Sequence, residues 1–147
     1  MDNYFSNVDL FKYLRSLQIC ACGTARVSSK NFPKAPKVDK TDDHEWNTLS
    51  GVIVDNAVLA AVWIDNAPVN LLTTFYTITG DCRVPRTRWR PRITSSNGKA
   101  IREYFQDAPS AAVVIPKIID DYNNHMNGVD ISDHCPHAAF SQVPTFP

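Results

Sequence analysis

The sequence predicts one mixed domain of helices and strands, α/β in class with α+β as the alternative. Hydrophobic residues make up 44% and charged residues 20% of its 147 residues, which is typical of a globular chain with a core. Apolar residues recur at helical spacing over residues 8–18. Two apolar runs, 58–64 and 69–78, flank the turn-forming sequence Asp-Asn-Ala-Pro, which is typical of a β-hairpin.

The sequence of the N-terminal third predicts the end of a strand, then a helix and then a short strand. Residues 1–7 have the composition of a strand that ends in a turn, with Asp2 at its tip and with Asn3, Ser6 and Asn7 as turn and cap residues. The helix over 8–18 follows. Residues 19–27 predict a short strand interrupted at Gly23.

Two later segments are predicted to be rich in loops. Residues 28–50 are polar and contain prolines, and residues 80–110 combine prolines with arginines. Between them, residues 51–79 predict the β-hairpin. Residues 111–115 predict a short apolar strand or helix lead-in, and Pro116 suits the first turn of the helix that follows.

The acidic segment 120–133 is the first candidate for chemistry because it holds four carboxylates in fourteen residues. If it is helical, Asp130 and Asp133 lie three positions apart on one face, where both can reach one cation. Ile118, Tyr122 and Met126 have apolar spacing that would bury the opposite face. The alternative is a solvated acidic helix end.

Three motifs resemble piggyBac-type transposases, in that family's order. Residues 121–133 contain Asp-Tyr-Asn, then Met, then Asn-Gly-Val-Asp and a further Asp, and resemble the segment with the third catalytic carboxylate. The opening Asp-Asn-Tyr-Phe-Ser of residues 2–6 resembles the motif with the second. Residues 63–74 resemble the family's Trp-x-Asp-x-x-Pro-Val piece, and Gly23-Thr24-Ala25-Arg26 resembles its Gly-Thr-x-Arg.

This resemblance implies a partial RNase H-like fold that lacks its first strands and carries a β-hairpin insertion. Residues 1–133 would form the truncated catalytic domain, and residues 134–147 a divergent disordered tail. In such transposases three carboxylates hold two Mg²⁺ ions. Asp2 and Asp130 would be the catalytic, metal-binding carboxylates, with Asp133 as a nearby metal ligand.

The first carboxylate of the family would lie upstream of Asp2, and only Met1 precedes Asp2 here. The chain is therefore expected to bind Mg²⁺ weakly or not at all, and to be inactive alone in DNA cleavage and joining. Two alternatives stay open: a domesticated DNA-binding module, and half of a longer active transposase. The resemblance implies a nuclear or nucleocytoplasmic location.

A basic segment supports the DNA-binding alternative. It places five guanidinium groups and one indole within ten residues, on a backbone that Pro85 and Pro91 keep extended: Arg83, Arg86, Arg88, Trp89, Arg90 and Arg92. Alternating arginines on a strand can follow a phosphate backbone, and an indole can stack on a base. Arginine clusters also occur on surfaces that bind nothing.

The remaining features of the sequence narrow the class of protein. The formal net charge is zero, so any attraction to nucleic acid must be local. No apolar run approaches the roughly 20 residues that span a bilayer, and the N-terminus lacks the pattern of a secretory signal, so no membrane partner is expected. Cys20 and Cys22 with His134, Cys135 and His137 form a weak zinc pattern, because the Cys-x-Cys spacing is tighter than usual.

Overall fold

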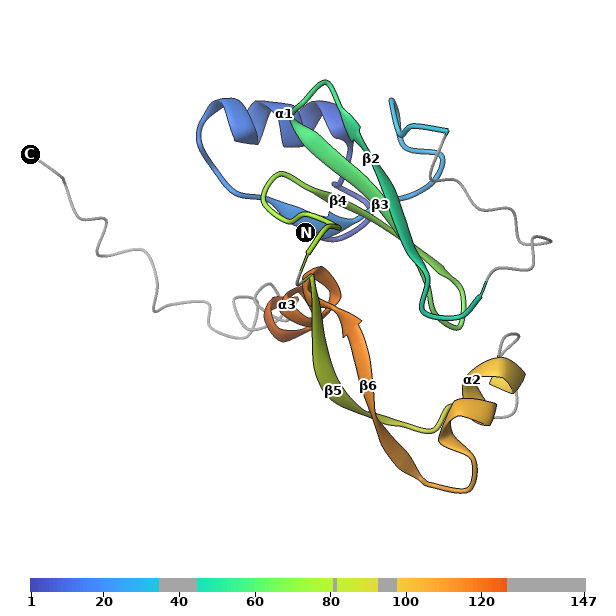
Figure 1. Ribbon diagram of the computed structural model, residues 1–147. Coiled ribbons are helices and arrows are strands. Elements are labelled where there is room, and N and C mark those ends of the chain that lie inside the picture. The colour runs from blue at the N-terminus through green and yellow to red at the C-terminus, as the bar shows by residue number, and fades with distance from the viewer. Residues whose placement is uncertain (35–44, 81, 93–97, 127–147) are drawn as a thin grey trace, which may run out of the picture.

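The structure of the chain is a computed structural model that describes residues 1–34, 45–80, 82–92 and 98–126 (Figure 1). Its elements are, in order, α1 (Val8–Ser16), β1 (Cys22–Thr24), β2 (Leu49–Val54), β3 (Val58–Ile64), β4 (Pro68–Thr73), β5 (Arg83–Trp89), α2 (Gly98–Phe105), β6 (Ser110–Pro116) and α3 (Lys117–His125).

The first four strands form one antiparallel sheet in the order β1-β4-β3-β2. Asp55, Asn56 and Ala57 connect β2 to β3 in a tight turn, in which Asp55 and Asn56 have positive φ and the Ala57 amide donates to the Val54 carbonyl at 3.0 Å. The predicted hairpin around residues 65–67 is confirmed, because β3 and β4 pair from Leu59 with Thr73 to Ile64 with Pro68. All seven residues of β3 are buried, since both faces of this central strand are covered.

One face of the sheet packs on α1. Val8 and Phe11 are fully buried against Val58, Ala60 and Leu72. Asn7 caps this helix by accepting a hydrogen bond from the Leu10 amide at 2.9 Å, so the predicted helix and its predicted cap are both confirmed.

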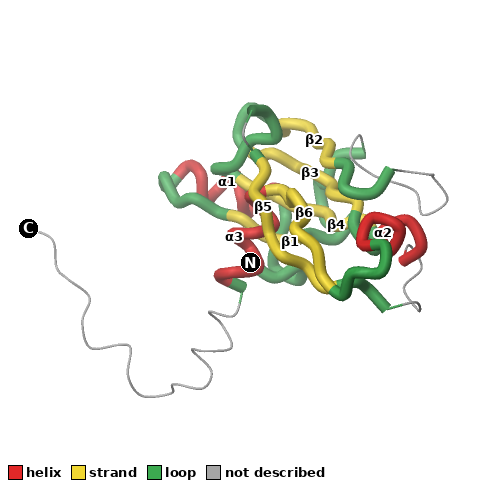
Figure 2. Tube along the Cα trace, turned by 60° about the horizontal axis from the view of Figure 1, so that its bottom comes forward, coloured by secondary structure: helices red, strands yellow, loops and turns green. Residues whose placement is uncertain are grey.

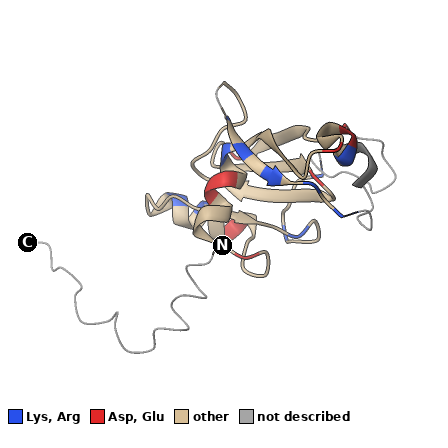
Figure 3. Cartoon of the chain, turned by 90° about the horizontal axis from the view of Figure 1, so that it is seen from below, with Lys and Arg blue, Asp and Glu red and all other residues tan. Residues whose placement is uncertain are grey.

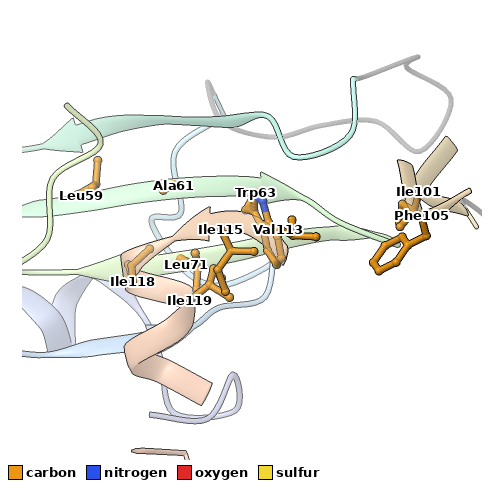
Figure 4. Close-up of a cluster of buried hydrophobic side chains, with 10 residues drawn as sticks. All are labelled: Leu59, Ala61, Trp63, Leu71, Ile101, Phe105, Val113, Ile115, Ile118 and Ile119. Atoms are coloured by element: carbon orange, nitrogen blue, oxygen red, sulfur yellow. The ribbon is translucent and has the colours of Figure 1, made fainter. Parts of the chain in front are cut away.

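The other face packs on the β5–β6 hairpin and α3, which lie below the four-stranded sheet in Figure 1. Figure 4 shows this cluster, with Trp63 and Leu71 of the sheet beside Ile115 of β6 and Ile118 and Ile119 of α3. Ile101 and Phe105 of α2 belong to the same cluster. Trp63 is 3% exposed, so it is a packing residue, as its sequence context suggests.

The chain is α+β in its described part, because every ladder there is antiparallel. Two sequence expectations need correction. The segment 80–110, predicted to be rich in loops, contains β5 and α2, and Gly23 lies inside β1 instead of interrupting it. β5 forms because its backbone pairs with β6, from Arg83 with Pro116 to Trp89 with Ser110 (Figure 2).

Candidate functional site

Asp2 lies in a tight turn at the start of the chain, between the edge of β1 and the beginning of α1. Its Oδ1 accepts a hydrogen bond from the Tyr4 amide at 2.8 Å, and its carbonyl accepts from the amides of Phe5 and Ser6 at 3.2 Å each. The residue is exposed. Its second carboxylate oxygen, Oδ2, therefore faces solvent in a turn whose backbone is already fixed.

Gly23 allows this turn to lie against β1. A Cβ at position 23 would stand 2.6 Å from the carbonyl oxygen of Met1 and 2.7 Å from the hydroxyl of Ser6, closer than real atoms approach. The amino group of Met1 also donates to the carbonyl of Cys22 at 2.8 Å. The Gly-Thr-x-Arg piece thus has a local physical reason, which is to support the turn that carries Asp2.

α3 is held in place through two consecutive carboxylates. Asp120 is only 6% exposed and forms a two-pronged ion pair with the guanidinium of Arg86 on β5. In Figure 3 the red segment of α3 lies beside the blue segments of the hairpin strand. The hydrogen bonds from Arg86 lower the pKa of Asp120 although burial opposes this, and the same pair raises the pKa of Arg86.

The next two residues of α3 contact the four-stranded sheet and the segment after β4. Asp121 accepts a hydrogen bond from the hydroxyl of Tyr76 at 2.6 Å. Burial, followed by this hydrogen bond, raises the pKa of Tyr76. The hydroxyl of Tyr122 lies 3.3 Å from that of Thr24 on β1. Three successive residues therefore fix the orientation of α3.

A pocket of about 200 Å³ lies where α3 approaches the N-terminal turn, which Figures 1 and 2 also show as neighbours. It is lined by Met1, Cys22, Tyr76, Asp121, Tyr122, His125 and Met126. Burial raises the pKa of the Cys22 thiol to about 11, so this cysteine is a neutral thiol at physiological pH. The residue before Asp2 and the end of α3 thus share one cavity.

Asp130 and Asp133, the other predicted metal ligands, lie outside the described residues, as does the predicted tail 134–147. Within the described part of the chain, no three side chains of His, Cys, Asp or Glu gather closely enough to hold a metal ion. Of the zinc pattern, only Cys20 and Cys22 are described, both as free thiols.

The first three arginines of the basic segment contact other groups of the protein. Arg83 donates to the side chain and the carbonyl of Asn47 at 2.9 and 2.8 Å. Arg86 pairs with Asp120. Arg88 forms two 2.9 Å hydrogen bonds with Asp65 and lies over the ring of Trp63 at 5.5 Å. Arg83 and Arg88 thus join the hairpin to segments that flank strands of the four-stranded sheet, and Arg86 joins it to α3.

The other members of the basic segment lie near the end of β5. Trp89 is 78% exposed. Arg90 is partly buried, and its Nε has no hydrogen-bond partner in the structure. Arg92 is exposed, and it also interacts with another group of the protein. A nucleic-acid contact through these residues stays a prediction.

Comparison with known protein families shows to which family the chain belongs. A family model described as Transposase IS4 matches residues 1–142, nearly the whole sequence. The chain belongs to this transposase family. Membership implies DNA binding in general, and these transposases generally use divalent metal ions. No curated protein and no solved structure matches the chain significantly. Among the described residues of this transposase domain, no helix is long and apolar enough to span a membrane.

Sequence reasoning missed one residue at the junction of the transposase domain's two sheets. Asn47 accepts from the indole of Trp63 at 2.8 Å and donates to the carbonyl of Val114 at 2.9 Å, besides its contacts with Arg83. Its left-handed backbone, with φ of 67°, suits asparagine better than most residues. It lies in a polar segment where nothing in the local sequence distinguishes it from its neighbours.

Proposed function

We propose that this chain is part of a piggyBac-type transposase catalytic domain with an RNase H-like fold. In this proposal Asp2 supplies the second metal-binding carboxylate and Asp130 the third, with Asp133 in support. The chain's membership of a transposase family and the three motifs in family order support this assignment.

The observation that carries the proposal is the pocket shared by Met1 and the end of α3. Asp2 follows Met1 directly, and Asp130 follows Met126 by four residues. Four residues span at most about 14 Å, and the proposal is that Asp130 lies within this reach of the pocket. In this proposal, two carboxylates far apart in sequence serve one site.

The chemistry of Asp2 fits a Mg²⁺ ligand. Mg²⁺ prefers hard oxygen donors, and Asp2 offers an exposed carboxylate whose Oδ1 is oriented by the Tyr4 amide. When bound between carboxylates, the ion would activate a water or hydroxyl and neutralise charge at the phosphate. The N-terminal turn orients Asp2, and α3 anchors the chain five residues before Asp130.

In this proposal the family motifs of the chain supply the second and third carboxylates and not the first. Without that ligand, the geometry that bridges two ions is incomplete. We therefore expect these residues by themselves neither to cut nor to join DNA, and a segment that bears the first carboxylate would complete the site.

Titration with Mg²⁺ and Mn²⁺ by calorimetry tests the proposal. Asp2→Asn keeps an oxygen for the Tyr4 amide, and Asp130→Asn keeps the side-chain shape, so both should fold normally. Each should weaken cation binding by on the order of tenfold, while the exposed Asp107→Asn control should not. Unchanged binding in both variants would refute the assignment, as would loss of folding in Asp130→Asn. Nicking of DNA by the unmodified 147-residue chain with Mg²⁺ would refute its predicted inactivity.

A further inference from the structure

Two aromatic side chains project from the turn that carries Asp2. Tyr4 is 71% exposed and Phe5 is 62% exposed. Their rings meet edge to face, with centroids 5.1 Å apart. Exposed aromatic rings leave apolar surface in water, so an adjacent exposed pair suggests a surface that another molecule covers.

A cation completes this surface. The guanidinium of Arg26 lies 5.4 Å from the centre of the Tyr4 ring. Within the described residues Arg26 pairs with no carboxylate, whereas Arg86 and Arg88 each pair with an aspartate. An exposed guanidinium without an acidic partner can bind an anion outside the protein.

The turn holds the two rings in a fixed arrangement before anything binds. Asp2 accepts hydrogen bonds from the amides of Tyr4, Phe5 and Ser6. Ser6 is buried against Gly23, and the hydroxyl of Ser29 donates to its carbonyl at 3.2 Å. Because the backbone is ordered in advance, binding at this surface costs little conformational entropy.

We propose that Tyr4, Phe5 and Arg26 form a binding surface for unpaired DNA beside Asp2. The aromatic rings stack on exposed bases, and Arg26 contacts a neighbouring phosphate. Unpaired DNA fits better than duplex DNA, because base faces inside a duplex are already stacked on each other. This inference rests on the proposed function, since it supplies the strand end on which a site at Asp2 would act.

Fluorescence anisotropy with a labelled 12-nucleotide oligothymidine and a duplex of equal length tests this surface. Tyr4→Ala and Phe5→Ala should each lower single-strand affinity about tenfold, whereas Tyr4→Phe, which keeps the ring, should retain it. Arg26→Ala should lower affinity and reduce the slope of log affinity against log salt by about one. Circular dichroism checks the fold of each variant.

Tyr13→Ala is the matched control, because it removes a similarly exposed aromatic side chain, 61% exposed, on α1 and outside the basic segment. The proposal is overturned if this control weakens single-strand binding as much as Tyr4→Ala, if the Tyr4 and Phe5 variants bind normally, or if the duplex binds as tightly. A dimer that Tyr4→Ala dissociates in sedimentation would also overturn it, because a protein would then cover the rings. If these tests fail while Asp2→Asn still weakens cation binding, the proposed function stands without this surface.

Discussion

Gly23 shows how one residue controls the position of the candidate catalytic turn. Replacing it with alanine places a methyl group against the backbone of Met1 and the hydroxyl of Ser6. We expect Gly23→Ala to destabilise the chain by about 1–3 kcal/mol. Hydrogen exchange at the Phe5 and Ser6 amides should accelerate. Gly80→Ala is the control: its φ of 69° strains an alanine locally, but its Cβ meets no atom within 4 Å, so those amides should stay protected. Unchanged protection in Gly23→Ala would show that the turn does not depend on this contact.

Asp120 makes stability depend on pH. Its pKa is lowered in the folded state, so the unfolded chain binds more protons in the acidic range. The stabilisation by Arg86 is therefore complete above the ordinary carboxyl range near pH 4, and is lost as the pH falls through the lower folded pKa. Asp120→Asn should reduce the urea midpoint at pH 7, with a difference that shrinks toward pH 3. Asp55→Asn, which removes an exposed carboxylate paired with Lys12, should show a much smaller effect at pH 7. Equal effects of the two substitutions would contradict this account.

At the scale of elements, Arg88 decides between two roles for β5. Its two hydrogen bonds to Asp65 and its place over Trp63 join the hairpin to the main sheet. Arg88→Lys keeps the charge but loses the planar fork, so we expect about 1–3 kcal/mol lower stability by urea denaturation. DNA affinity, measured by filter binding at two salt concentrations, should stay unchanged. A loss of DNA affinity with normal stability would instead favour the DNA-binding module.

The sequence predicts those elements whose signal is local. Apolar spacing and the cap at Asn7 are sufficient for α1, and the Asp-Asn-Ala-Pro turn is sufficient for the β3–β4 hairpin. The sequence predicts an extended backbone for β5 but not its pairing in a sheet, because arginines and Pro85 are poor strand signals. It forms nevertheless, since a strand of a two-stranded sheet has a free edge that tolerates proline.

The partners of the candidate site depend on distant contacts. Motif resemblance is sufficient to single out Asp2 and the acidic segment. It does not predict that Asp120 pairs with a residue 34 positions away or Asp121 with one 45 positions away. The sequence does not distinguish an arginine that pairs with a buried aspartate from one that is free to bind phosphate. Only the fold brings the aspartate beside the arginine.

For the whole molecule, the two hydrophobic clusters share the central strands β3 and β4. Leu71 and Leu72 are neighbours in β4 and both are fully buried, but Leu71 belongs to the cluster with α3 and the hairpin, and Leu72 to the cluster with α1. Because successive side chains of one strand support opposite faces, loss of either face should unfold both. Leu71→Ala and Leu72→Ala should each cost about 2–5 kcal/mol. Far-UV circular dichroism and the fluorescence of Trp46 and Trp63, which pack in the cluster with Leu71, should then give one coincident urea transition in each variant. Two separated transitions, of which Leu72→Ala shifts only the one at lower urea concentration, would show that the α1 face folds independently of the face that anchors α3.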